Sequence, residues 1–125
     1  MIHLDTSVLV DALTGPRRSG PALLKMYERG ERVQLSTMVL YEWLRGPRRE
    51  AEIADQEALF PLDQAQPFGP REAALAAELY RTVSRARDRE LDLAVAACAV
   101  TRGAIVWTLN DGDLRDIPGL ALFQP

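Results

Sequence analysis

Acidic residues placed where the chain should otherwise be buried are the feature that most constrains its fold. Asp5, Glu42 and Asp92 each stand within a run of apolar residues, and Asp113 follows such a run after a short polar stretch. A carboxylate taken out of water is costly unless it is paired, hydrogen-bonded or bound to a metal. No Lys or Arg lies within these runs to neutralise the acids. We therefore expect a fold that brings the four acids together around a divalent cation.

Length and composition predict one ordinary globular domain over residues 1–125. The chain is 47% hydrophobic and 26% charged, which is typical of a globular protein, and no apolar run approaches the roughly 20 residues that span a bilayer. The N-terminus lacks the pattern of a signal peptide. A single cysteine, Cys98, permits no internal disulfide and is predicted to be a core residue, which together suggest a cytoplasmic protein without a membrane anchor.

Apolar periodicity and the punctuation by Gly and Pro predict alternating strands and helices. Strands are expected at 2–4, 33–36, 104–107 and 120–123. Helices are expected at 6–13, 21–29, 37–44, 49–60, 70–87 and 90–102. This alternation predicts a three-layer α/β/α sandwich with a mainly parallel sheet. Sites in such folds lie beyond the carboxyl ends of the strands, which is where Asp5 and Asp113 fall.

Each acid also has a purely structural interpretation. Asp5 and Asp92 could serve the N-terminal ends of helices, where a carboxylate satisfies free amides. Asp113 could be a turn residue. Glu42 is harder to explain in this way, because it stands near the C-terminal end of a predicted helix, where the dipole disfavours an anion. The four placements together favour a shared site.

The ordered motifs of this chain resemble the PIN-domain nucleases, and among them the compact VapC-type toxins of bacterial toxin–antitoxin pairs. The resemblance covers essentially the whole chain. It rests on Leu4-Asp5-Thr6-Ser7, on Glu42 placed six residues after Ser36, on the run 92–97, and on the segment 108–113 followed by Ile117-Pro118-Gly119-Leu120. Two departures, Trp107 and Leu114 at positions where the family usually has other residues, do not touch a carboxylate.

The resemblance implies a PIN-like fold and an endoribonuclease that requires Mg²⁺ or Mn²⁺. It also implies a homodimer that is inhibited by a small antitoxin protein. In such a site Asp5 and Asp92 are expected to be the principal metal ligands, and Asp113 to complete the shell directly or through water. Glu42 is expected to hold a second metal or to orient the attacking water. The side chains expected to support these acids are Thr6, Ser7, Thr108 and Asn110, although Thr6 and Ser7 could instead cap a helix.

Three arginines on either side of Gly46-Pro47 are candidates for RNA contacts. Arg45 lies three residues after Glu42, on the same predicted helix face. Arg48 and Arg49 follow Gly46-Pro47, where the loop leaves them free to meet phosphates. The net charge of −3 nevertheless argues against a protein that simply coats nucleic acid.

Other functions fit the sequence less well. RNA cleavage without a metal usually needs a pair of histidines, and His3, within an apolar strand, is the only one. A phosphoacceptor domain would need a late lysine, whereas Lys25 is the only lysine, and an aspartate-nucleophile phosphatase would need an acid where Ser7 stands. A catalytically inactive PIN-like module that binds RNA or protein remains the alternative, and the four intact acids argue against it.

Overall fold

A three-stranded parallel sheet is the centre of the fold, which a computed structural model describes over residues 1–125. Strand β1 (Ile2–Leu4) lies between β2 (Val33–Gln34) and β3 (Ile105–Trp107). Ile2 pairs with a residue of β2 on one side and with one of β3 on the other, and both pairings are parallel. The predicted α/β sandwich with a parallel sheet is therefore confirmed.

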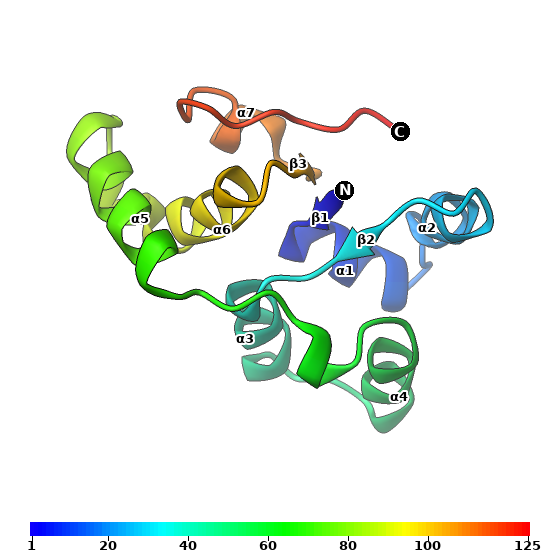
Figure 1. Ribbon diagram of the computed structural model, residues 1–125. Coiled ribbons are helices and arrows are strands. Elements are labelled where there is room, and N and C mark those ends of the chain that lie inside the picture. The colour runs from blue at the N-terminus through cyan, green and yellow to red at the C-terminus, as the bar shows by residue number, and fades with distance from the viewer.

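Seven α-helices surround this sheet, and most of them lie where apolar periodicity places them. Their bounds are α1 (Thr6–Leu13), α2 (Gly20–Glu28), α3 (Thr37–Arg45), α4 (Glu50–Leu59), α5 (Pro70–Thr82), α6 (Glu90–Thr101) and α7 (Asp111–Leu114). Two short 3₁₀ helices, η1 (Leu62–Gln64) and η2 (Ala86–Arg89), complete the chain. Figure 1 shows the strands between α5 and α6 on one side and α1 and α2 on the other. No helix is both long and apolar enough to cross a membrane.

The core is divided in two because side chains alternate between the faces of the sheet. Ile2, Leu4 and Trp107 belong to a cluster of 16 buried residues that extends to α1, α3 and α4. Val106 points the other way and joins a cluster of 8 residues with Leu93 and other residues of α6. Helix α6 packs deep inside the molecule, since its residues from Leu93 to Ala99 are all buried.

Cys98, which was predicted to be a core residue, and His3 both lie in this core. Cys98 is fully buried, and burial raises the pKa of its thiol to about 11. His3 is also buried, and neither ring nitrogen has a hydrogen-bond partner. Burial is the main reason that the pKa of His3 falls to about 4. Both side chains are therefore held in their neutral forms.

Three predicted boundaries are wrong. The helix predicted over 70–87 ends at Thr82, because Val83 is already extended (φ −85°, ψ 155°), and the left-handed residue Arg85 (φ 51°) then leads into η2. The strand predicted over 33–36 ends early, because the Ser36 hydroxyl accepts a hydrogen bond from the amide of Val39 at 3.2 Å and so caps α3. The last predicted strand is reduced to one bridge between Val106 and Leu122.

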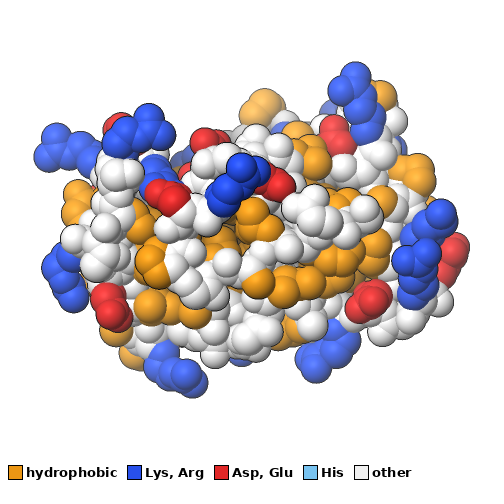
Figure 2. All heavy atoms as spheres, turned by 90° about the horizontal axis from the view of Figure 1, so that it is seen from above, with side chains coloured by type: hydrophobic (Ala, Val, Ile, Leu, Met, Phe, Trp, Pro, Cys, Tyr) orange, Lys and Arg blue, Asp and Glu red, His pale blue; other side chains and the backbone are white.

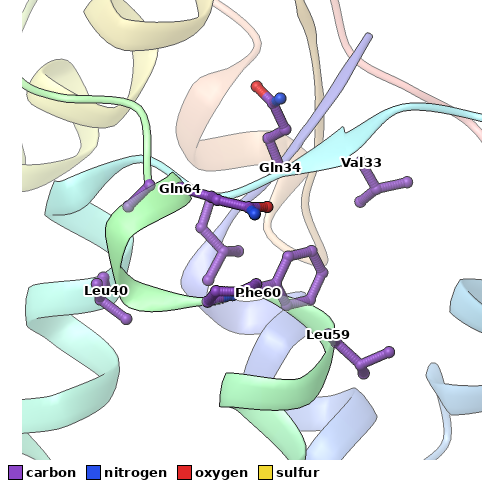
Figure 3. A pocket seen from close by; sticks show the side chains of 9 residues that line it. Val33, Gln34, Leu40, Leu59, Phe60 and Gln64 are labelled. Atoms are coloured by element: carbon purple, nitrogen blue, oxygen red, sulfur yellow. The ribbon is translucent and has the colours of Figure 1, made fainter.

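The segment after α4 closes the outer edge of the sheet at β2. The amide of Gln66 donates to the carbonyl of Leu35 at 2.8 Å, which extends the pairing beyond β2. Figure 3 shows the small hollow left between this segment and the sheet, where Val33, Phe60 and Gln64 are among the lining residues. Its volume is about 40 Å³ and no acid lines it, so it offers no metal chemistry.

Candidate metal centre

Asp5 stands at the carboxyl end of β1, at the point where the chain enters α1. It occupies the position before the first helical residue, but its carboxylate makes no capping hydrogen bond to the helix. Its Oδ2 atom instead accepts hydrogen bonds from the hydroxyls of Thr108, at 2.7 Å, and Ser7, at 3.1 Å. The residue is buried. The Asp5 carboxylate is therefore oriented by side chains, and helix capping does not explain it.

Two hydroxyls, one in the first turn of α1 and one directly after β3, form a small network around this acid. Thr108 Oγ1 also accepts a hydrogen bond from the amide of Asn110 at 2.9 Å, and Ser7 Oγ accepts one from the amide of Leu109 at 3.0 Å. Asn110 precedes α7, but its exposed side chain does not cap that helix. The supporting contacts predicted for Ser7 and Thr108 are present, whereas Asn110 contributes only its backbone.

Glu42 projects from α3 and is fixed from two directions. Its Oε1 atom accepts a hydrogen bond from the Thr6 hydroxyl at 2.8 Å, which links α3 to the first turn of α1. Its Oε2 atom lies 3.8 Å from Nη2 of Arg45, as expected for residues three apart on one helix. The Glu42 side chain is 19% exposed. The acid is thus held at the edge of the core, with one oxygen bonded to a hydroxyl.

Asp92 lies in the first turn of α6, and the charges of the other three acids affect its pKa. Its pKa is raised to about 6, chiefly by burial and also by the negative charges of Asp5, Glu42 and Asp113. The positive charge of Arg89 acts in the opposite direction. An acid responds in this way only when like charges are close and solvent screening is weak. The fold therefore gathers four acids that are separated by up to 108 residues in the sequence.

Asp113 lies on α7, on the exposed side of the same site. It lines a hollow of about 210 Å³ together with Asp92, while Glu42 and Asp92 line a second hollow of about 340 Å³. Both hollows share Asp88, Arg89 and Asp92, and we call them together the acidic groove. The groove is open and almost entirely polar, which suits a charged, hydrated substrate.

The donors of this groove fit a hard divalent cation. As the side chains stand, no three His, Cys, Asp or Glu groups are close enough to form a complete metal-binding cluster. Mg²⁺ does not require such a cluster, because it prefers oxygen ligands, keeps several waters and is commonly held by one or two carboxylates. Asp5 supplies a carboxylate of fixed orientation. Asp92 supplies a carboxylate whose ionised form is disfavoured by the negative charges of the neighbouring acids. A cation would relieve that repulsion.

The three predicted RNA-contacting arginines differ in how free they are. Arg48 lies over the ring of Trp43, at 4.2 Å from the centroid, and its Nε donates to the Trp43 carbonyl at 2.9 Å. Arg45 lies 5.3 Å from the ring centroid of Tyr41 and half-exposed beside Glu42. Arg49 is 80% exposed and its nearest acid, Glu52, is 3.4 Å away. Figure 2 shows basic side chains spread round the rim of one face, with no single basic patch there.

Sequence reasoning missed the arginines of the groove itself. Arg85, Arg87 and Arg89 line the two hollows, and Arg89 is buried and forms an ion pair with Asp116. One signal was available, because Arg89 precedes Asp92 by only three residues in the sequence. The pairing with Asp116 depends on tertiary structure and has no signal in the local sequence.

Comparisons with known proteins agree with the fold. The family model described as PIN domain matches residues 2–120. Ribonuclease VapC19 of Mycobacterium tuberculosis is 30% identical over 129 residues, which cover 98% of this chain and 96% of that protein.

Two solved structures show the same fold at lower identity. DNA-bound VapBC from Salmonella typhimurium has a TM-score of 0.74, with 19% identity and coverage of 98% and 96% of the two chains. VapBC2 from Rickettsia felis, bound to a promoter DNA fragment, has a TM-score of 0.71, with 20% identity and 98% coverage of both chains.

Proposed function

This chain belongs to the PIN-domain family, with the VapC ribonucleases among its relatives, and from that premise we propose that it is a metal-dependent endoribonuclease that acts as the toxin of a toxin–antitoxin pair. The observation that carries the proposal is the placement of Asp92 among three other carboxylates at the carboxyl end of a parallel sheet. A structural role would not require Asp92 to lie where the charges of three other acids, from separate parts of the chain, act against its own.

Asp5 and Asp92 would hold Mg²⁺ or Mn²⁺, and Asp113 would add a ligand directly or through water. A bound divalent cation lowers the pKa of water and stabilises negative charge on a phosphodiester. Glu42 would either hold a second cation or orient the attacking water, and the hydrogen bond from Thr6 to its Oε1 atom supports either role. Ser7 and Thr108 both donate hydrogen bonds to Oδ2 of Asp5 and so fix the orientation of this carboxylate. A carboxylate held in this way would be ready to bind the cation.

RNA would approach along the acidic groove, with its phosphates met by arginines at the rim. Arg45 and Arg49 are exposed enough to serve, and Arg85 and Arg87 line the groove. Arg48 is engaged with Trp43, so its main contribution would be to the end of α3. Contacts with phosphate carry little sequence information, and their strength falls as salt rises.

An antitoxin and a second copy of the chain are the proposed protein partners. Several structural neighbours are VapBC assemblies, and one of them is described as a member of a family of toxin–antitoxin systems. An antitoxin Arg that reached the four carboxylates would replace the charge of the cation and block the groove. For the homodimer, Tyr41 and Leu44 on α3 offer apolar surface, being 54% and 42% exposed, whereas Trp43 is fully buried in the core.

The test is cleavage of single-stranded RNA by purified protein, with EDTA and with Mg²⁺ or Mn²⁺ restored afterwards. We expect cleavage only when the cation is present, and a loss of several orders of magnitude in Asp5→Asn. Cleavage that survives complete removal of metal would overturn the mechanism. RNA binding without cleavage under every metal condition would favour the inactive PIN-like module instead.

A further inference from the structure

Arg89 is a buried arginine in the acidic groove, and its side chain is only 8% exposed. It makes hydrogen bonds to three different residues. Nη1 donates to the Ser84 carbonyl at 3.1 Å and to Asp116 Oδ2 at 3.0 Å. Nη2 donates to the Asp113 carbonyl at 2.8 Å and to Asp116 Oδ1. A guanidinium held on both ends by one carboxylate has little freedom to rotate.

These bonds tie the start of α6 to α7. Arg89 immediately precedes α6, which carries Asp92, whereas Asp113 and Asp116 belong to α7 and the turn after it. The Asp113 side chain makes no hydrogen bond of its own, so the position of this acid depends on how its backbone is held. The bond from Arg89 to the Asp113 carbonyl is therefore a direct link between two of the four proposed metal ligands.

The same contacts determine the position of the charged guanidinium group of Arg89. Arg89 and Asp92 are three residues apart, and both line the two hollows of the groove. Asp116 takes both terminal nitrogens of the guanidinium, and the remaining nitrogen, Nε, is buried without a partner. Without Asp116, the nearest acids left for this charge would be Asp92 and Asp113. An arginine paired with either acid would compete with a cation for it.

We propose that Arg89, anchored by Asp116, is a positioning residue of the acidic groove that fixes Asp113 beside Asp92 and is itself kept out of the metal-binding position. This inference rests on the proposed function, because it concerns the affinity of the groove for its cation. Asp116 acts through Arg89 and does not touch the metal.

The test uses Asp116→Asn, with Asp63→Asn as the matched control. Both substitutions remove one negative charge from an exposed acid, but Asp63 lies on η1, outside both hollows of the groove, and makes no hydrogen bond to Arg89. Affinity for Mn²⁺ is measured by titration calorimetry, and RNA cleavage is measured over a range of Mn²⁺ concentrations. We expect Asp116→Asn to weaken Mn²⁺ binding about tenfold or more, as for other residues that orient ligands. Cleavage should recover at saturating Mn²⁺, and Asp63→Asn should stay within about threefold of wild type.

A conservative variant separates positioning from general stability. Asp116→Glu keeps the carboxylate and should restore most of the Mn²⁺ affinity, whereas Arg89→Lys keeps the charge but loses the fork and should weaken binding as Asp116→Asn does. Thermal unfolding in EDTA checks that each variant is folded. Equal Mn²⁺ affinity in Asp116→Asn, Arg89→Lys and wild type would overturn the inference alone. Absence of Mn²⁺ binding in the wild type would overturn the proposed function and this inference with it.

Discussion

Asp92 is the residue at which burial and like charge act together, and the sequence predicted only part of this. The apolar neighbours of Asp92 indicated that it would lose solvent, and the fold places three more acids near it. The resemblance indicated Thr108 as a supporting side chain, but the local sequence could not reveal that it holds Asp5, because that contact joins residues 103 apart. Local patterns identify which side chains are out of place, whereas the hydrogen bonds that hold them depend on the completed fold.

The pKa values of Asp92 and His3 predict an unusual dependence of metal-free stability on pH. The pKa of Asp92 is raised to about 6, so its contribution favours folding at low pH and is lost as the pH rises through 6. The pKa of His3 is lowered to about 4, so its contribution favours folding above about 6.5 and is lost as the pH falls. Between pH 7 and 5 the two contributions oppose each other.

We therefore expect Asp92→Asn to change the pH profile as well as activity. In EDTA the wild-type free energy of unfolding should change little from pH 7 to pH 5, because the two contributions offset each other. Asp92→Asn should be at least as stable as wild type at pH 7 but should lose stability toward pH 5, since only the His3 contribution remains. Chemical denaturation at four pH values measures this. Parallel profiles in the two proteins would show that Asp92 is not perturbed by its neighbours.

At the level of elements, apolar runs and Gly-Pro punctuation predicted most helices and strands, and they failed where backbone geometry depends on distant contacts. The expected helix is interrupted at Val83, and no breaker residue in the sequence marks this position. Helix α7 was not predicted, because its four residues contain a glycine and two acids and read as a turn. Its place is fixed by Leu114 in the smaller core cluster and by the bonds from Arg89.

The end of α3 gives a test of which arginines serve structure and which serve binding. Arg48 folds back over Trp43, and a Cβ at Gly46 would lie 2.9 Å from its Nη2, so glycine leaves room for it. We expect Arg48→Ala to lower the free energy of unfolding by about 1–2 kcal/mol, through loss of the cation–π contact and one hydrogen bond. Arg49→Ala should change stability by less than about 0.5 kcal/mol.

RNA binding should respond in the opposite way. Arg49→Ala should weaken binding of single-stranded RNA and reduce the slope of log affinity against log salt by roughly 0.7, the value for one phosphate contact. Denaturant titration and fluorescence anisotropy at several salt concentrations, applied to both variants, separate the two effects. An Arg49→Ala protein with an unchanged salt slope would remove this residue from the proposed RNA interface.

At the scale of the whole molecule, parallel strands joined by helices bring segments from both ends of the chain to one edge of the sheet. This is why Asp5 and Asp113 could be placed near each other from the sequence alone. The ion pair between Arg89 and Asp116 lies at the same edge but could not be predicted, because neither residue interrupts an apolar run. The sequence thus indicated the four proposed metal-binding acids. It did not indicate the arginine, Arg89, that links α6 to α7.

The exposed apolar side chains of α3 predict self-association. Tyr41 and Leu44 project from the surface, although their neighbour Trp43 is in the core. We expect a dimer at micromolar concentration by light scattering, and a shift toward monomer in Leu44→Glu with little change in thermal stability. As a control for added charge, Leu62→Glu alters another exposed leucine, on η1, and should leave the dimer intact. A wild-type protein that is monomeric at this concentration would contradict the prediction.

The central claim is that four carboxylates from separate elements form one divalent-cation site, and calorimetric titration with Mn²⁺ tests it most directly. We expect saturable binding to the wild type and an affinity at least tenfold lower in both Asp5→Asn and Asp92→Asn. Asp63→Asn removes an exposed acid of η1, which lies in neither hollow of the groove, and should bind Mn²⁺ as the wild type does. Unchanged affinity in both Asp5→Asn and Asp92→Asn would show that these acids do not form the site.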